Sequence, residues 1–200
     1  MFDRNWNPSG ESQKSYQSRI DSGFMHRYLS GSAILDIGGS GYEPNPKTIT
    51  QNAVNIDLDY PGYDGLNLPF PDQSQDAVYS SHCLEHIESW KETLQEWFRV
   101  IKVHGYLVII VPHQMLYEKK SRLPSRYNSD HKRFYLPHIL LDQLEKALPK
   151  SEWRLRHCCE NDLFFDYSIP PAQHSVGCYE IECVVEKIPP YQFLNELEST

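Results

Sequence analysis

The feature that most constrains the fold of this chain is a short apolar run that ends in an acid and then breaks into glycines. It reads Ile34-Leu35-Asp36-Ile37-Gly38-Gly39-Ser40-Gly41. Apolar runs of this length are typical of buried parallel strands. The glycines after it lack Cβ atoms, so the backbone can turn sharply and approach a ligand closely. The pattern predicts a strand that delivers the backbone to a small-molecule site.

A second acid indicates which kind of ligand the site binds. Val54-Asn55-Ile56 is another apolar run, and it ends in Asp57. A glycine turn followed by an acid about 20 residues later is the arrangement of nucleotide sites, in which the acid accepts hydrogen bonds from ribose hydroxyls. We therefore expect Asp36 and Asp57 to lie at neighbouring strand ends around one ligand.

Composition excludes several classes of protein. The 200 residues, 40% of them hydrophobic, suffice for one domain with a full core. The net charge of −8 weighs against nucleic acid as the main partner, because duplex binding needs a basic surface. No apolar stretch reaches the roughly 18 residues of a membrane span, and residues 1–6 lack the basic-then-apolar order of a signal peptide. We expect a cytoplasmic protein that binds neither nucleic acid nor membrane.

The cysteines indicate neither a disulfide framework nor a metal site. Their number is odd and no Cys-x-x-Cys occurs. They are Cys83, Cys158, Cys159, Cys178 and Cys183. We expect buried free thiols, with Cys158 and Cys159 in a strand interior, and no bound metal.

Hydrophobic periodicity predicts strands that alternate with helices. Strands are expected at 33–37, 54–58, 76–80, 106–111, 153–158 and 179–186. Helices are expected at 13–29, 90–101 and 136–148. Pro44 and Pro46 fall where the first crossover helix should begin, so any helix there is short, at about 46–51.

This order predicts an α/β fold. We expect a Rossmann-like, doubly wound and mostly parallel sheet with helices on both faces. The last two strands lack an intervening helix, so they are expected to form an antiparallel hairpin at one edge. Because there is no repeat and no linker, residues 1–200 are expected to form a single domain, with residues 1–30 as a helical lead-in.

Several motifs, in this order, carry a likeness to a known family. After the glycine turn and Asn55-Ile56-Asp57 comes Leu68-Pro69-Phe70-Pro71, and the block ends in Leu84-Glu85-His86-Ile87. Together they resemble the class I S-adenosylmethionine-dependent methyltransferases, most closely the type 11-like branch that acts on small molecules. The match runs from about residue 33 to residue 111. It implies a methyltransferase-like domain that uses S-adenosylmethionine.

The resemblance implies roles for residues at matching positions. Asp36 would support the methionine end of the cofactor, Asp57 would accept from the ribose hydroxyls, and Asp64 would accept from the adenine amino group. Leu58 would pack on adenine. His82, with the two serines before it, would line the floor near the transferable methyl. The implied cofactor set is Asp36, Gly38, Gly39, Ser40, Asp57, Leu58, Asp64, Leu66, Ser80 and Ser81.

The glycine turn departs from the family pattern. The family commonly shows Gly-x-Gly-x-Gly after the acid, but here Ser40 and Tyr42 stand where the second and third glycines would be. This departure leaves open a methyltransferase-like scaffold or binding subunit that has lost turnover. A nicotinamide-dependent oxidoreductase is a more distant alternative, because the full Gly-x-Gly-x-x-Gly is missing.

Residues 112–135 form a long, irregular and basic stretch in an otherwise acidic chain. Stretches of this kind usually have a function, although a solvated loop is the alternative. We expect a lid that binds a small-molecule or glycan acceptor, anionic or phosphorylated, with sugar O-methylation as one reaction. The expected acceptor ligands are the anion-binding Arg122, Arg126 and Arg133 and the stacking Tyr117 and Tyr127.

A hydroxyl acceptor would need a base, and histidine is the usual one near neutral pH. His131 and His113 rank first because they lie in the expected lid, and His82 follows. If the acceptor is an amine or a carboxylate, no base is needed. For Glu85 and His86, capping and packing are the preferred interpretation. The acceptor and the oligomeric state cannot be read from the sequence.

Overall fold

A single six-stranded sheet organises the protein. The computed structural model describes residues 2–39 and 45–191. The strands are β1 (Ile34–Ile37), β2 (Val54–Ile56), β3 (Gln75–Ser81), β4 (Ile101–Pro112), β5 (Trp153–Asn161) and β6 (Glu180–Lys187). Their order in the sheet is β2-β1-β3-β4-β6-β5. The first four are parallel, and β6 lies antiparallel between β4 and β5. The predicted α/β fold is confirmed, including the antiparallel pair at one edge.

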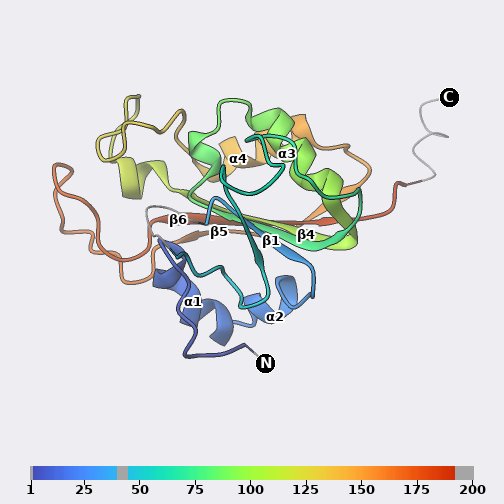
Figure 1. The fold of residues 1–200 in the computed structure, drawn as a ribbon. Helices are drawn as coiled ribbons and strands as arrows, with labels where there is room; N and C mark the ends of the chain where they lie inside the picture. The colour runs from blue at the N-terminus through green and yellow to red at the C-terminus, as the bar shows by residue number, and fades with distance from the viewer. Residues whose placement is uncertain (1, 40–44, 192–200) are drawn as a thin grey trace.

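Helices cover both faces of the sheet (Figure 1). The helices α3 (Trp90–Val100) and α4 (Pro137–Ala147) lie on one face, and α1 (Ser12–Asp21) and α2 (Phe24–Tyr28) lie on the other. The single helix expected over 13–29 is broken at Gly23, whose φ of 76° is left-handed. Two short turns, η1 (Leu84–His86) and η2 (Gln114–Glu118), follow β3 and β4.

The crossover from β1 to β2 has no helix in residues 45–53, so the short helix expected at 46–51 is wrong. Proline restricts the backbone there. Instead, Ile49 is fully buried in the cluster formed by the N-terminal helices, which includes Tyr16, Phe24 and Met25. The N-terminal helices therefore cover the face that a crossover helix would otherwise cover.

The two late strands differ in burial. Every residue of β6 is buried, whereas β5 is an edge strand that is mostly exposed. Cys158 and Cys159 lie within β5 as expected, but Cys159 is exposed and Cys158 half-buried, so the expectation of buried thiols is wrong for these two. All five cysteines are free thiols, and only Cys178 and Cys183 are fully buried. Among the described residues, no helix is long and apolar enough to cross a membrane.

Candidate active site

The carboxyl ends of the four parallel strands meet at one edge of the sheet. Gly38 follows β1, Asp57 follows β2, His82 follows β3 and His113 follows β4. The Gly38 N–H donates to the Ile56 carbonyl at 2.9 Å, which joins the first two strand ends. Open α/β sheets bind ligands at this edge. The structure thus brings together the residues that the sequence places at strand ends.

Asp36 is a buried acid with one carboxylate oxygen available. It is 3% exposed, and its Oδ2 accepts a hydrogen bond from the Ile49 N–H at 2.6 Å. Its Oδ1 has no hydrogen-bond partner within the described residues. Burial raises the pKa of Asp36 to about 7, although the Ile49 N–H acts in the opposite direction. A buried acceptor of this kind suits an ammonium donor supplied by a ligand.

The glycine turn passes close to this acid. A Cβ on Gly39 would lie 2.9 Å from Asp36 Oδ1, and a Cβ on Gly38 would lie 2.5 Å from Cys83 Sγ. Gly38 also has a φ of 76°, a conformation that disfavours side chains. Both glycines are therefore required by the local packing. Ser40 and Tyr42, at which the turn departs from the family pattern, lie outside the described residues.

The segment after β2 presents an acid and an exposed apolar side chain. Asp57 Oδ1 accepts from the Leu58 N–H at 2.8 Å, and the Leu58 side chain is left 75% exposed. An exposed leucine beside an acid is compatible with a flat base stacked next to a ribose. Leu66 lies nearby in sequence and is half-buried.

Asp64 is fully engaged by its own loop. Its carboxylate accepts from the Asn67 side chain at 2.7 Å and from the Asn67 and Leu66 backbone N–H groups at 2.7 and 3.0 Å. These bonds, the Asn67 side chain first, lower the pKa of Asp64 to about 2. The carboxylate shapes the loop, and its contact with adenine stays a prediction.

The end of β3 holds a histidine beside acids. Ser80 is buried and Ser81 is half-buried, and His82 follows with a left-handed φ of 51°. His82 Nε2 lies 3.3 Å from Glu180 Oε1. Burial opposes charge on the ring, but Glu180, Glu85 and Glu11 together raise the pKa of His82. A raised pKa favours the protonated ring, which donates hydrogen bonds rather than abstracting a proton.

His113 acts as a cap. Its Nδ1 accepts from the backbone N–H groups of Met115 and Leu116 at 3.1 and 3.3 Å, at the start of η2. Its Nε2 lies 3.1 Å from Glu160 Oε1. Both ring nitrogens are therefore engaged, which leaves neither for proton abstraction in this conformation.

His131 is buried beneath the expected lid. Its Nδ1 lies 2.5 Å from Glu118 Oε1, and the second oxygen of Glu118 accepts from the Ser125 hydroxyl at 2.6 Å. The ring stacks on Tyr117 with centroids 5.4 Å apart. This leaves Nε2 of His131 available for chemistry.

The expected lid is well packed. Tyr117 lies at the centre of an aromatic cluster with Tyr127, His131, His174 and Tyr179. The Tyr127 hydroxyl donates to the carbonyls of Pro171 and Gln173 at 2.7 and 2.6 Å, which ties the lid to the 162–179 loop.

The predicted arginines of the lid differ in their surroundings. Arg122 and Arg126 are exposed. The guanidinium of Arg133 donates to the carbonyls of Leu84, Ile87 and Glu88, and so fixes the η1 turn. Arg133 therefore has a structural use in this conformation, whereas Arg122 and Arg126 remain exposed cations.

Sequence reasoning missed two acids at this edge, Glu11 and Glu180, and assigned Glu85 to capping and packing. Glu11 Oε2 accepts from the Tyr179 hydroxyl at 2.8 Å, and Glu180 joins His82 to Arg19. These partners come from opposite ends of the chain, so no local pattern signals them. For Glu85, the only local feature that suggested a functional role was the neighbouring His86.

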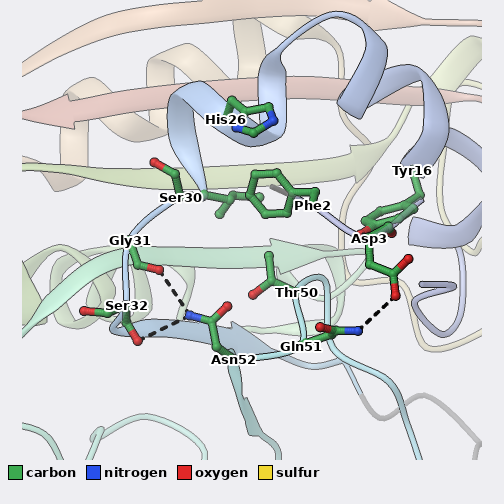
Figure 2. Close-up of a pocket in the computed structure, with 11 residues that line it drawn as sticks. Phe2, Asp3, Tyr16, His26, Ser30, Gly31, Ser32, Thr50, Gln51 and Asn52 are labelled. Atoms are coloured by element: carbon green, nitrogen blue, oxygen red, sulfur yellow. Dashed lines mark hydrogen bonds between the residues drawn. The ribbon is translucent and has the colours of Figure 1, made fainter. Parts of the chain in front are cut away.

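A separate hollow of about 370 Å³ lies away from this edge. Figure 2 shows its lining, in which Asn52 Nδ2 donates to the carbonyls of Gly31 and Ser32 at 3.1 and 3.4 Å. Because Gly31 and Ser32 precede β1, the hollow lies at the amino end of that strand. It therefore takes no part in the site at the carboxyl ends.

The sheet order, the inserted antiparallel strand, and the glycines and acids at the ends of β1 and β2 define a class I S-adenosylmethionine-dependent methyltransferase fold. The chain resembles this family over part of its length. Residues 22–109 match the family described as "Methyltransferase domain". The cofactor of the family is S-adenosylmethionine, and the unpartnered Oδ1 of buried Asp36 beside the glycine turn fits its ammonium group.

Curated relatives match over short stretches. Ajmaline N-methyltransferase of Rauvolfia serpentina is 38% identical over 50 residues, which are 25% of this chain and 17% of that protein. The ubiquinone/menaquinone biosynthesis C-methyltransferase UbiE of Vibrio cholerae is 26% identical over 95 residues, 48% of this chain and 36% of that protein. The matched stretch thus spans well under half of each relative.

Solved structures share the fold over most of the chain. A SAM-dependent methyltransferase from Aquifex aeolicus superposes with a TM-score of 0.53 at 16% identity, covering 90% of this chain and all of that one. The 1,6-didemethyltoxoflavin-N1-methyltransferase of Burkholderia thailandensis, solved with S-adenosylhomocysteine, superposes with a TM-score of 0.53 at 13% identity. The superposition covers 89% of this chain and 80% of that one. At these identities the likeness concerns the fold.

Proposed function

We propose that this chain transfers a methyl group from S-adenosylmethionine to a small-molecule or glycan acceptor. One observation carries the proposal. Within the stretch that matches the methyltransferase family, a glycine turn, the unpartnered oxygen of buried Asp36, and Asp57 converge at one sheet edge. No feature of the described residues favours an inactive scaffold, because the departures at Ser40 and Tyr42 lie outside them.

The residues of this edge would hold the cofactor. Asp36 would accept from the α-ammonium, Asp57 from the ribose hydroxyls, and Leu58 would cover one face of adenine. When bound, the sulfonium supplies a methyl group that an acceptor atom attacks in line. Positioning provides much of the rate in such a displacement. The walls of the methyl site would be Ser80, Ser81 and the ring of His82.

We further propose that residues 112–135 bind the acceptor. The exposed Arg122 and Arg126 would pair with an anionic or phosphorylated group. The aromatic cluster around Tyr117 would support a sugar ring below them. Sugar O-methylation fits this chemistry, and for a hydroxyl acceptor His131 is the histidine that retains an available ring nitrogen at the site.

Isothermal titration with S-adenosylmethionine and S-adenosylhomocysteine tests the cofactor proposal. We expect saturable binding of both, and no binding at millimolar cofactor would overturn it. A methyl-transfer screen with radiolabelled cofactor against nucleotide sugars, glycans and small acids tests the acceptor class. Label transfer only to protein or nucleic acid would contradict the small-molecule assignment.

A further inference from the structure

A fully buried carboxylate lies among histidine nitrogens beside the proposed methyl site. Glu85, in η1, is 0% exposed, and neither of its carboxylate oxygens has a hydrogen-bond partner in the described part of the chain. Its Oε1 lies 3.7 Å from His86 Nε2, and 3.9 Å from both His131 Nε2 and His82 Nδ1. These separations exceed a hydrogen bond. A buried carboxylate left without a partner is costly, so the site calls for a group between these atoms.

The two histidines are oriented toward Glu85 by other carboxylates. His86 Nδ1 lies 3.2 Å from Asp130 Oδ2, and His131 Nδ1 lies 2.5 Å from Glu118 Oε1. A carboxylate at Nδ1 holds the ring proton there, which leaves the lone pair of Nε2 as a ligand. Carboxylate–histidine pairs of this kind are the usual surroundings of metal-ligating histidines.

The spacing of the three groups suits a small cation. One ligand atom from each of Glu85, His86 and His131 lies within 4.8 Å of the other two. Ligands about 2.1 Å from a tetrahedral ion are roughly 3.4 Å apart. The observed separations of 3.7 and 3.9 Å therefore need to close by only a few tenths of an ångström.

The groups are also held in place by the backbone. The Lys132 N–H donates to the Glu85 carbonyl at 2.8 Å, which joins the turn of Glu85 to the segment of His131. Arg133 donates to the Leu84 carbonyl at 2.8 Å. The rings of His86 and His131 meet edge to face with centroids 4.8 Å apart. The ligand set is thus largely formed before any ion binds.

We propose that Glu85, His86 and His131 bind a divalent transition-metal cation, with Zn²⁺ as the best match. Two imidazoles and one carboxylate form a ligand set of catalytic zinc sites, whereas Mg²⁺ prefers oxygen ligands. Three protein ligands leave a coordination position open. The expectation of no metal is thereby revised. It rested on cysteine spacing, and the ligands here come from two distant segments.

The position of the cation suggests its use, and this step rests on the proposed function. η1 follows β3, whose end lines the proposed methyl site. An acceptor hydroxyl at the open position would lose its proton to solvent near neutral pH. The hydroxyl oxygen would then bond to the methyl carbon while the carbon–sulfur bond breaks. The electron pair of that broken bond would stay on sulfur. His131 then serves as a metal ligand in place of the general base.

Metal titration of the chelator-treated protein tests the site. A second group, His157, Cys159 and Glu182, also has metal-ligand spacing, so all titrations use a Cys159→Ser background. We expect one Zn²⁺ per chain by isothermal titration, and visible absorption of a Co²⁺ complex. Glu85→Gln and His131→Asn should each weaken Zn²⁺ binding at least 100-fold. His138→Asn, an exposed histidine of α4, is the matched control and should bind as the parent does.

Two further measurements keep the outcome decisive. Circular dichroism confirms that each variant folds. Glu118→Gln changes the partner of His131 Nδ1 but none of the three proposed ligands, and should weaken Zn²⁺ binding 10–100-fold. Parent-like Zn²⁺ affinity in the Glu85 and Glu118 variants, or no Zn²⁺ binding by the parent, overturns the assignment. Binding of S-adenosylhomocysteine is measured separately. If Zn²⁺ binds and that ligand does not, the proposed function fails while the metal site stands.

Discussion

The protonation of Asp36 links burial to cofactor affinity. Its pKa, raised by burial to about 7, lies above that of an exposed aspartate, so the folded chain binds a proton between about pH 4 and pH 7 that the unfolded chain releases. The contribution of Asp36 to stability is therefore present at low pH and is lost as pH rises through 7.

The ammonium group of the cofactor prefers the ionised form of Asp36. We expect affinity for S-adenosylhomocysteine to rise roughly tenfold from pH 6 to pH 8. Titration of Asp36→Asn should give weaker, pH-independent binding, and a parent-like profile would refute the assignment.

The ribose assignment of Asp57 predicts a local loss. Asp57→Ala removes an acceptor for two hydroxyl donors, and hydrogen bonds to charged groups contribute about 1.5–3 kcal/mol. We expect a 10- to 100-fold increase in the dissociation constant of S-adenosylhomocysteine, measured by isothermal titration. Asp59→Ala, an exposed acid two residues later, is the control and should leave affinity unchanged. Equal effects of the two variants would contradict the assignment.

Sequence alone placed Asp36, Gly38 and Asp57 together because Asp36 lies near the end of β1, Gly38 and Asp57 directly follow β1 and β2, and parallel strands share one edge. It did not indicate that Glu85 and His86 lie beside His131. The carboxylates that contact the two histidines, Asp130 and Glu118, belong to a segment with no regular pattern. The roles of His113 and Arg133 depend on backbone groups that no spacing rule reveals.

At the scale of elements, a buried ion network joins α1 to the sheet. Arg19 is 2% exposed and donates to Glu182 at 2.8 Å and to Glu180 at 3.0 Å. Removing one partner of a buried ion pair costs about 3–5 kcal/mol, because the other charges remain buried. We expect Arg19→Met to lower the free energy of unfolding by about this amount in urea denaturation.

The exposed pair between Arg4 and Asp21 is the control for this network. Exposed ion pairs contribute about 0–1 kcal/mol. Arg4→Met should therefore change the unfolding midpoint little. Similar losses in the two variants would show that the Arg19 network is no more stabilising than a surface pair.

The same network explains why β6 is more buried than its sequence pattern predicts. The alternation of β6 predicts one polar, solvated face, yet the strand is buried throughout. Glu180 and Glu182 pair with Arg19 of α1, and Glu186 pairs with Arg156 of β5. Lys187 donates to the carbonyl of Phe98 in α3 at 2.9 Å. Periodicity located the strand correctly, but it could not reveal these partners, which lie on other elements.

For the whole molecule, cofactor binding should appear as thermal stabilisation. A ligand at 100 times its dissociation constant stabilises the folded state by about 2.7 kcal/mol. For a domain of this size, each kcal/mol shifts the melting temperature by about 2–4 °C. We expect S-adenosylhomocysteine to raise it by about 5–10 °C in differential scanning calorimetry. Asp57→Ala at the same ligand concentration should show a much smaller shift, and equal shifts would indicate binding elsewhere.

The pairing of α1 with β6 has a consequence for biosynthesis. Arg19 and Glu180 are 161 residues apart, so Arg19 acquires its carboxylate partners only when the last of the six strands emerges from the ribosome. Contacts of such long sequence separation form slowly, and incomplete chains expose apolar surface in the meantime. A nascent chain stalled before β6 would carry an arginine without its carboxylate partners, and β4 would lack its antiparallel neighbour. This makes it a natural client for chaperones that bind nascent chains.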